Sequence, residues 1–356
     1  MSEPPRRGVR WLADPRVLLG LAVTAASLAW VLQGVDFGQV LRDMGRADLW
    51  ILLLPSVPAY VLALWVRALR WRHLTDAIEP LSGGPLFRAV ALGFLANNVF
   101  PLRLGEVIRA FVLAREAGLS SAAVFGTVIV ERLIDAAVIL GLAALVLGLG
   151  GAEALGIDAR AVLPPLVALA LAPTVFVAAL RLAPDRAIGL GMALIGWALP
   201  GRVRDRLEGI LHQIASGLGS LRGGRHLGWL AFHSVVLWLV LAPIPFAATL
   251  LALDIDLGSP SRLAAVSYTL LVWIGAAVAL PSAPGFFGPY HAACWLALRP
   301  FGVPKELAVA LGTLAHAVFW LTSTLVGLVV LRSRSTSLEA LGEAASAGKD
   351  PPEARR

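Results

Sequence analysis

The sequence predicts an all-α polytopic membrane protein, and its composition and its apolar runs carry that prediction. Hydrophobic residues make up 58% of the 356 residues, and the mean hydropathy is +0.78. Several apolar runs approach or exceed the ~20 residues that a helix needs to cross a bilayer. We expect helices because lipid offers backbone groups no hydrogen-bond partner, and no alternating strand pattern indicates a barrel.

Six apolar segments are long enough to be full membrane-spanning helices. The first follows a basic N-terminal stretch, and we interpret it as a signal anchor because no convincing small-residue cleavage site follows. Two further apolar segments are broken and form a separate class. The six predicted spans are residues 17–32, 49–66, 121–148, 161–180, 227–253 and 307–331.

Arginines beside the predicted spans indicate how the chain is oriented. They precede the first span, follow the second and fill the segment between the fourth and fifth, whereas the loops near Glu153, Asp158, Asp254 and Asp256 are poor in cations. Because cytoplasmic loops carry the excess of Lys and Arg, we expect a plasma-membrane protein with both termini in the cytoplasm. The net charge of +7 then reports topology, and no nucleic-acid partner is expected. The arginines are Arg6, Arg7, Arg10, Arg16, Arg67, Arg70, Arg72, Arg88, Arg181, Arg186, Arg202, Arg204, Arg206, Arg222, Arg225, Arg332 and Arg334.

Two apolar segments are interrupted by proline and glycine and predict re-entrant hairpins. The first runs over 86–99, stops at Pro101 and resumes over 104–113; the second runs over 262–280 and resumes over 291–298. The predicted topology has the first enter from the cytoplasm and the second from outside. Span, hairpin and span would then occur twice in opposite orientation, an inverted repeat of the kind found in transporters. In the alternative, both segments simply span and the chain has eight transmembrane helices.

The remaining segments define the predicted domain organisation. Residues 1–16 form a cytoplasmic N-terminal segment, 17–331 the transmembrane domain, and 332–356 a disordered cytoplasmic tail rich in Ala, Glu, Ser and Pro. Within the transmembrane domain, 204–221 has apolar residues at helical spacing. It lies either on the cytoplasmic leaflet as an amphipathic helix or against other parts of the protein.

A first charged constellation surrounds the break in the first hairpin. Arg103, Glu106 and Arg109 are spaced at i, i+3 and i+6, so a helix would carry them on one face. Two guanidinium forks suit a phosphate, while the carboxylate could read a cationic group. Asn97 and Asn98 add amide donors and acceptors beside it. The alternative is an interfacial anchor whose arginines reach the lipid headgroups.

A second constellation, formed by Glu131, Arg132 and Asp135, lies inside the predicted span 121–148. Charged groups at membrane depth cost several kcal/mol unless they are paired or face water, so we expect them to point into the bundle. They would contact either Arg103 and Arg109, which is a structural role, or a cationic part of a substrate.

Other reactive residue types give no enzymatic signature. The single cysteine, Cys294, excludes an intrachain disulfide. His233 and His291 are expected to be hydrogen-bonded bundle residues, since no cluster of His, Cys and carboxylates has metal-ligand spacing. There is no nucleophile elbow, P-loop or dinucleotide fingerprint. No cofactor and no metal are therefore expected.

Four ordered motifs resemble the lysylphosphatidylglycerol synthase transmembrane region, or flippase-like, family, and the resemblance runs from about Arg16 to Leu331. It implies an integral protein of the bacterial or archaeal plasma membrane, associated with moving aminoacylated phospholipid or other lipid-linked molecules between leaflets. The motifs are RALRWR from Arg67, LGEVIRA from Leu104, ERLID from Glu131 and PSAPGFFG from Pro281.

Two departures from the family pattern bear on function. Members that synthesise aminoacyl lipid carry a large soluble domain after the membrane region, whereas a short tail follows Leu331 here, so synthase activity is not expected. The second Pro/Gly motif of the family often continues to a glutamate, and this sequence has Pro289, Tyr290 and His291 instead. Because a titratable imidazole replaces an anion, the resemblance leaves open whether the substrate is the same as in the family.

The sequence supports three functional hypotheses. The leading one is a transporter that is not an enzyme, whose partners are membrane lipids: an anionic or aminoacylated phospholipid, or a polyprenyl-linked lipid. The second is a non-catalytic subunit that recruits a membrane-associated synthase or glycosyltransferase, and the third is a transferase using Glu131 or Asp135 as base. The predicted substrate-binding residues are Asn97, Asn98, Arg103, Glu106, Arg109, Glu131, Arg132, Asp135, Pro284, Gly285, Gly288 and His291.

Overall fold

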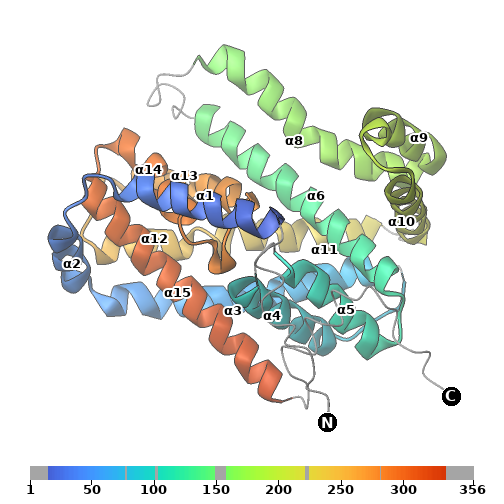
Figure 1. The fold of residues 1–356 in the computed structure, drawn as a ribbon, viewed down its shortest axis with the longest axis horizontal. Helices are drawn as coiled ribbons and strands as arrows, with labels where there is room; N and C mark the ends of the chain where they lie inside the picture. The colour runs from blue at the N-terminus through green and yellow to red at the C-terminus, as the bar shows by residue number, and fades with distance from the viewer. Residues whose placement is uncertain are drawn as a thin grey trace, which may run out of the picture.

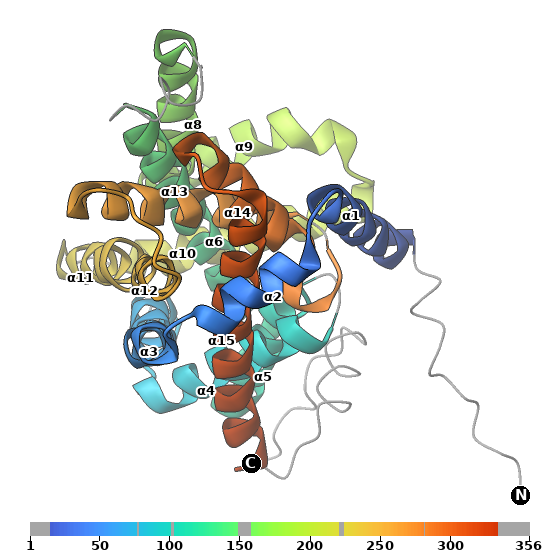
Figure 2. The same cartoon turned by 90° about the vertical axis from the view of Figure 1, so that its left-hand side faces the viewer.

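A computed structural model describes residues 15–76, 78–100, 103–148, 158–220, 224–280 and 282–333. Over this part of the chain every regular element is a helix, and the helices pack into one bundle (Figures 1 and 2). The predicted N-terminal segment 1–16 and the predicted disordered tail 332–356 lie outside the described residues, apart from two residues at the inner end of each.

The helices follow one another with short connections. The longer ones are α1 (Pro15–Leu32), α3 (Leu49–Thr75), α6 (Ser121–Val146), α8 (Ala159–Leu182), α10 (Gly201–Ser220), α13 (Pro260–Ala279) and α15 (Lys305–Arg332). The shorter ones are α2 (Phe37–Arg46), α4 (Gly83–Val99), α5 (Gly105–Ala117), α9 (Pro184–Ile195), α11 (Gly224–Val235), α12 (Ile244–Ala252) and α14 (Pro289–Leu298), with a π-helical turn η4 (Val236–Leu241) and short 3₁₀ turns η3 (Gly196–Ala198), η5 (Pro284–Phe286) and η6 (Arg299–Phe301).

The helix lengths confirm a polytopic membrane protein. Five continuous helices are long and apolar enough to cross a bilayer, and α1 passes the same test together with α2, which turns away from it by 87° (Figure 2). Helix α6 has 26 residues but carries the three charges of the second constellation. The five are Leu49–Thr75, Ala159–Leu182, His226–Ala252, Pro260–Ala279 and Lys305–Arg332.

Helix α13 bears on the predicted number of crossings. With 20 residues it is long enough to span, whereas the hairpin interpretation treats it as one arm of a re-entrant segment. Its partner arm α14 has only 10 residues, or about 15 Å of helix. In the first broken segment, α4 and α5 have 17 and 13 residues. The choice between two hairpins and eight crossings stays a prediction.

Both broken segments turn beside the middle of α15. The side-chain amide of Asn98 donates to Ser323 Oγ at 2.9 Å, and His316 Nε2 donates to the carbonyl oxygen of Gly285 at 2.6 Å. At a rise of 1.5 Å per residue, His316 and Ser323 lie about 17 and 27 Å from the start of a helix about 42 Å long. The two breaks therefore lie deep inside the bundle, away from both ends of α15.

Close backbone contact locks the first hairpin. The backbone N–H of Gly105 donates to Asn97 Oδ1 at 2.9 Å, so the amide of Asn97 holds the start of α5 against the end of α4. A Cβ atom on Gly105 would overlap the carbonyl oxygen of Gly93, which lies on α4. Glycine is needed here because the two helices approach backbone to backbone.

The break in the second hairpin packs against α1. Gly285 and Gly288 have φ values of 72° and 89°, which favour glycine. A Cβ on Gly288 would come within 2.7 Å of the carbonyl oxygen of Thr24, and the backbone N–H of Ala283 donates to Thr24 Oγ1 at 2.9 Å. The Pro/Gly motif thus sets the path of the backbone beside α1.

The predicted amphipathic segment 204–221 is helical over its described residues, as α10. Its Leu211 and Ala215 are buried, and Leu207 and Ile210 pack against the core. Helix α10 contacts α6, α8 and α9, of which α6 and α8 run side by side in Figure 1. Packing against the protein itself, the second of the two alternatives, accounts for its apolar face.

Candidate functional site

An ion-pair network joins α3, α5 and α6 inside the bundle. Arg70 of α3 is fully buried and donates to Glu131 Oε1 at 2.8 Å and to Asp135 Oδ1 at 2.6 Å. The second oxygen of Glu131 accepts from Arg109 of α5 at 2.9 Å. Of the two roles that the sequence left open for the second constellation, Glu131 therefore has the structural contact with Arg109.

The treatment of Arg67 and Arg70 as loop residues beyond the second span is wrong. Helix α3 continues to Thr75, so both arginines lie within it. Arg67 Nη1 lies 3.7 Å from Asp135 Oδ2, beside the Arg70 pairs. A signal was present, because arginines at i and i+3 on one helix match carboxylates at i and i+4 on another.

Arg132 connects the buried network to a more open layer. Its Nη2 lies 2.8 Å from Glu131 Oε1 and 2.9 Å from Asp135 Oδ2, and its Nη1 lies 3.6 Å from Glu106 Oε1. Glu106 also pairs with Arg109 at 2.7 Å. The two constellations predicted from sequence are thus one cluster.

Aromatic rings frame the cluster. The guanidinium of Arg109 lies 4.9 Å from the ring centroid of Trp71, and that of Arg67 lies 5.2 Å from that of Trp238. Trp238 Nε1 donates to Asp135 Oδ1 at 2.8 Å. Such cation–π contacts are strongest where water is excluded. The sequence analysis missed Trp238, because nothing in the sequence indicates that this residue lies beside Asp135.

Arg103 differs from the other arginines of the cluster. Its guanidinium lies 5.6 Å from the ring centroid of Phe286, so it links the break of the first hairpin to that of the second. It has no ion pair within 4.0 Å among the described residues. Its charge is therefore the least neutralised in the cluster.

A cavity of about 590 Å³ lies beside the cluster. One part of its wall is polar, and most of the rest is apolar. The polar side chains are Arg67, Asn97, Arg103, Glu106, Arg132, Asp135 and Ser323. The aromatic and larger aliphatic ones are Tyr60, Leu64, Phe94, Ile139, Leu140, Leu237, Trp238, Leu241, Phe246, Leu271, Ile274, Val278, Phe286, Tyr290 and Phe319.

The charges of the cluster do not cancel. Five arginines (Arg67, Arg70, Arg103, Arg109 and Arg132) accompany three carboxylates (Glu106, Glu131 and Asp135), which leaves an excess of two positive charges. Three of the arginines and two of the carboxylates line the cavity, so its wall has an excess of one positive charge. A cavity with such a wall is suited to a ligand that has an anionic group and a long apolar part.

The twelve predicted site residues fall into three groups. The first group lines the cavity: Asn97, Arg103, Glu106, Arg132 and Asp135. The second supports it from within the bundle: Asn98, Arg109 and Glu131. The third lies in or beside the second break and is not part of the cavity wall: Pro284, Gly285, Gly288 and His291.

His291 lies in a small aromatic cluster. Its ring centroid is 5.4 Å from that of His316, which stacks on Tyr290 at 4.4 Å. The sequence analysis singled out His291 and missed His316, whose hydrogen bond to Gly285 fixes the second break. Tyr290 and His291 are neighbours in the sequence, and only the fold brings His316 of α15 beside them.

Comparison with known proteins identifies the family. A family model described as the lysylphosphatidylglycerol synthase TM region matches residues 17–327. The chain belongs to this family. A protein named glycosyltransferase AglD, from Haloferax volcanii, is 27% identical over 361 residues; the alignment covers 94% of this chain and 57% of that protein. The chain thus spans little more than half the length of that relative. No solved structure matches the chain.

Proposed function

We propose that the chain moves an anionic or aminoacylated phospholipid, or another lipid-linked molecule, between the leaflets of the plasma membrane. The observation that supports this most is the cavity, whose polar wall carries excess positive charge while the remaining wall is apolar. Polar groups inside a membrane domain mark the path of a polar substrate. The headgroup would occupy the charged part of the cavity.

Arg103 and Arg132 are the arginines best placed to bind a phosphate. Both line the cavity, and Arg103 has no carboxylate partner among the described residues. Arg109 was assigned the same role from sequence, but it is buried and its guanidinium pairs with Glu106 and Glu131. In this proposal Arg109 therefore positions the carboxylates, and Arg132 takes its place at the phosphate.

The carboxylates of the cavity wall would read the rest of the headgroup. Glu106 and Asp135 both line the cavity, within reach of a cationic or hydroxylated group whose phosphate lies at Arg103. An aminoacyl ester or a sugar carries such groups. The carboxylates also prevent the site from binding every anion equally well.

The lipid tail would leave the cavity between α6 and α13. Ala136 of α6 and Ala276 and Ala279 of α13 line the cavity and are exposed, so they mark where it reaches the surface of the bundle. Beside this opening the helices close, because a Cβ on Gly275 would lie 3.1 Å from Ile139 Cδ1. Small side chains leave room there for an acyl or isoprenoid chain.

Leaflet exchange in proteoliposomes tests the proposal. Lysyl-phosphatidylglycerol, phosphatidylglycerol and a polyprenyl phosphate are compared, with wild type, Arg103→Ala and Arg42→Ala. Arg42 is an exposed arginine on α2 and serves as the matched control. We expect headgroup-selective exchange that Arg42→Ala keeps and Arg103→Ala loses. Absence of exchange for all three lipids, or unchanged exchange in Arg103→Ala, would contradict the assigned role.

The relative named a glycosyltransferase favours a second candidate function. This chain aligns with 57% of its length, so the chain could act as a membrane subunit for a separate glycosyltransferase or synthase. This hypothesis expects stable co-purification with such an enzyme and no exchange by the chain alone. The transferase hypothesis has less support, because Glu131 and Asp135 are each engaged by several arginines and are poorly placed to accept a proton.

A further inference from the structure

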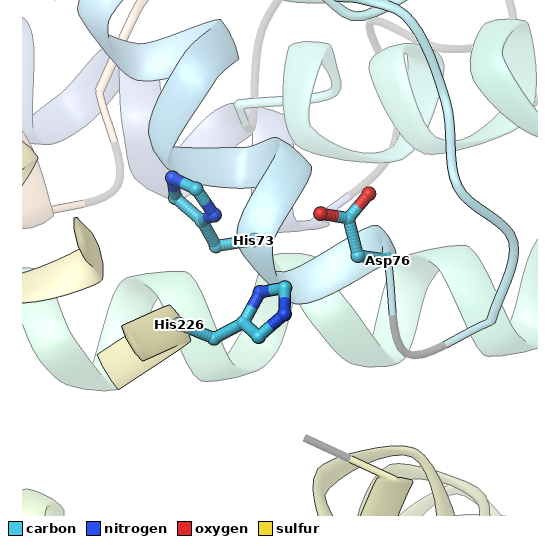
Figure 3. A group of neighbouring side chains, drawn as sticks. All are labelled: His73, Asp76 and His226. Atoms are coloured by element: carbon cyan, nitrogen blue, oxygen red, sulfur yellow. The ribbon is translucent and has the colours of Figure 1, made fainter. Parts of the chain in front are cut away.

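Two histidines and an aspartate meet at the end of α3, away from the cavity wall. His73 is in the last turn of α3, Asp76 caps that helix, and His226 is in the first turn of α11. The three side chains share the space between these two helix ends (Figure 3). One potential ligand atom from each lies within 4.8 Å of the others, and all three residues are half-buried.

The residue types suit a divalent transition-metal ion. Imidazole nitrogens and carboxylate oxygens are ligands for Zn²⁺, and three protein ligands with a fourth open position form a common zinc site. The three ligand atoms all lie within 4.8 Å of one another, so one ion placed between them could contact all three side chains.

Unsatisfied polar atoms point to a ligand at the same place. His73 Nδ1 and Asp76 Oδ1 are buried and form no hydrogen bond within the described part of the chain. Asp76 has one weak ionic neighbour, Arg72 Nε at 3.8 Å. Buried polar atoms without a partner are uncommon and call for an explanation such as an ion.

A third imidazole borders the cluster. His233 lies about two helical turns after His226 on α11. Its ring centroid is 5.2 Å from that of His73. Its Nδ1 donates to the carbonyl oxygen of Trp229 at 2.7 Å, which fixes the ring. A bond of this kind orients imidazoles in metal sites.

We propose that His73, Asp76 and His226 bind one divalent transition-metal ion of the Zn²⁺ class, which joins the end of α3 to the start of α11. The sequence analysis expected no metal, because no cluster of His, Cys and carboxylates has ligand spacing along the chain. This proposal does not depend on lipid transport and is tested by metal binding alone.

The site connects α3, which carries Arg67 of the cavity wall, to α11, which leads into the η4 turn with Trp238 of that wall. Three residues before His73, α3 carries Arg70, and α11 continues through η4 to Trp238, which donates to Asp135. An ion at the helix ends would hold these two elements at a fixed separation. It would also stabilise the folded state, since the ligands come together only on folding.

Zinc binding to the purified full chain tests the proposal. The protein is purified through a tag without histidine, treated with a chelator and titrated with ZnCl₂ in a calorimeter. Co²⁺ absorption then reports the coordination geometry. The variants are His73→Ala, His226→Ala and Asp76→Asn, and the matched control is His212→Ala, an exposed histidine on α10.

We expect wild type and His212→Ala to bind one Zn²⁺ per chain and to melt at a higher temperature with zinc. His73→Ala and His226→Ala should bind at least tenfold more weakly and lose the zinc-dependent shift. Size-exclusion chromatography shows whether each variant is folded; Asp76→Asn, which keeps the shape of the side chain, provides the comparison if a histidine variant is not. Equal zinc affinity in wild type and in the folded variants would overturn the proposal.

Discussion

The charged cluster has two halves that use the same residue types differently. The inner half, Arg70, Arg109 and Glu131, has side chains that are 0%, 5% and 0% exposed. The cavity half consists of Arg67, Arg103, Glu106, Arg132 and Asp135, all of which line the cavity. Burial and pairing, which the residue types alone do not reveal, separate the two.

The inner half is a closed ionic structure. The carboxylate oxygens of Glu131 lie 2.8 to 2.9 Å from guanidinium nitrogens of Arg70, Arg109 and Arg132, so each oxygen has a donor. Removing charges from water costs several kcal/mol for each ion, and only close pairing compensates. These groups are consequently committed to one another and are not available to a ligand.

The cavity half leaves capacity for a ligand. Arg132 is 35% exposed and has a loose contact of 3.6 Å with Glu106, and Arg103 has no ion pair with a described residue. A phosphate could therefore enter without breaking a buried pair. Comparison of the halves indicates that variants of the inner half should change stability, whereas variants of the cavity half should change binding.

The largest expected effect is that of Glu131→Ala. It leaves Arg70 and Arg109 buried without their shared partner, so we expect a loss of about 3–5 kcal/mol in the free energy of unfolding. Denaturant titration of the purified protein in detergent measures it, and poor yield of folded protein is the extreme form. Glu79→Ala, which removes an exposed carboxylate, is the control. If the two variants were equally stable, the inner half would not be structural.

Arg132→Ala comes next, because Arg132 belongs partly to both halves. It loses contacts with Glu131 and Asp135, but the Arg132 side chain is 35% exposed and each carboxylate keeps another arginine. We expect a loss of about 1 kcal/mol in the same titration. Leaflet exchange should fall as well. A loss as large as that of Glu131→Ala would place Arg132 in the inner half.

The fold class and the charged clusters could be predicted from the sequence for physical reasons. The length of an apolar run can be read from the sequence and shows whether a helix there could cross a bilayer. Charges within such runs, as at Glu131 and Asp135, must pair or face water. The same reasoning predicted helix breaks near Pro101 and Gly285. These features are local, so a single sequence contains them.

Features that depend on contact between distant segments were missed. Arg70 was interpreted as a loop residue because the apolar run ends near Val66, whereas α3 continues once Glu131 and Asp135 neutralise it. His73 and His226 likewise meet only through the packing of α3 and α11. The hydropathy of a segment therefore does not reveal where its helix ends when charged residues within it are paired across the fold.

A smaller effect is expected for Arg88→Gln, which calibrates the comparison. Arg88 of α4 pairs with Glu116 of α5 near the surface, so the pair joins the same hairpin without deep burial. Exposed ion pairs contribute about 0–1 kcal/mol and are screened by salt. Denaturant titration at low and high salt should therefore give a small difference that shrinks with salt. A larger, salt-independent loss would show that burial is not what separates the halves.

The smallest effect on stability is expected for Arg103→Ala, which breaks no ion pair with a described residue. The free energy of unfolding without lipid should match that of wild type within about 0.5 kcal/mol. With lipid the two should diverge, because a ligand at 100 times its Kd stabilises the folded state by about 2.7 kcal/mol. Thermal unfolding with and without a polyprenyl phosphate or phosphatidylglycerol measures this. If Arg103→Ala kept the full lipid-dependent stabilisation, Arg103 would not bind the phosphate. If it lost only the lipid-dependent part, Arg103 would contribute to ligand binding and not to folding.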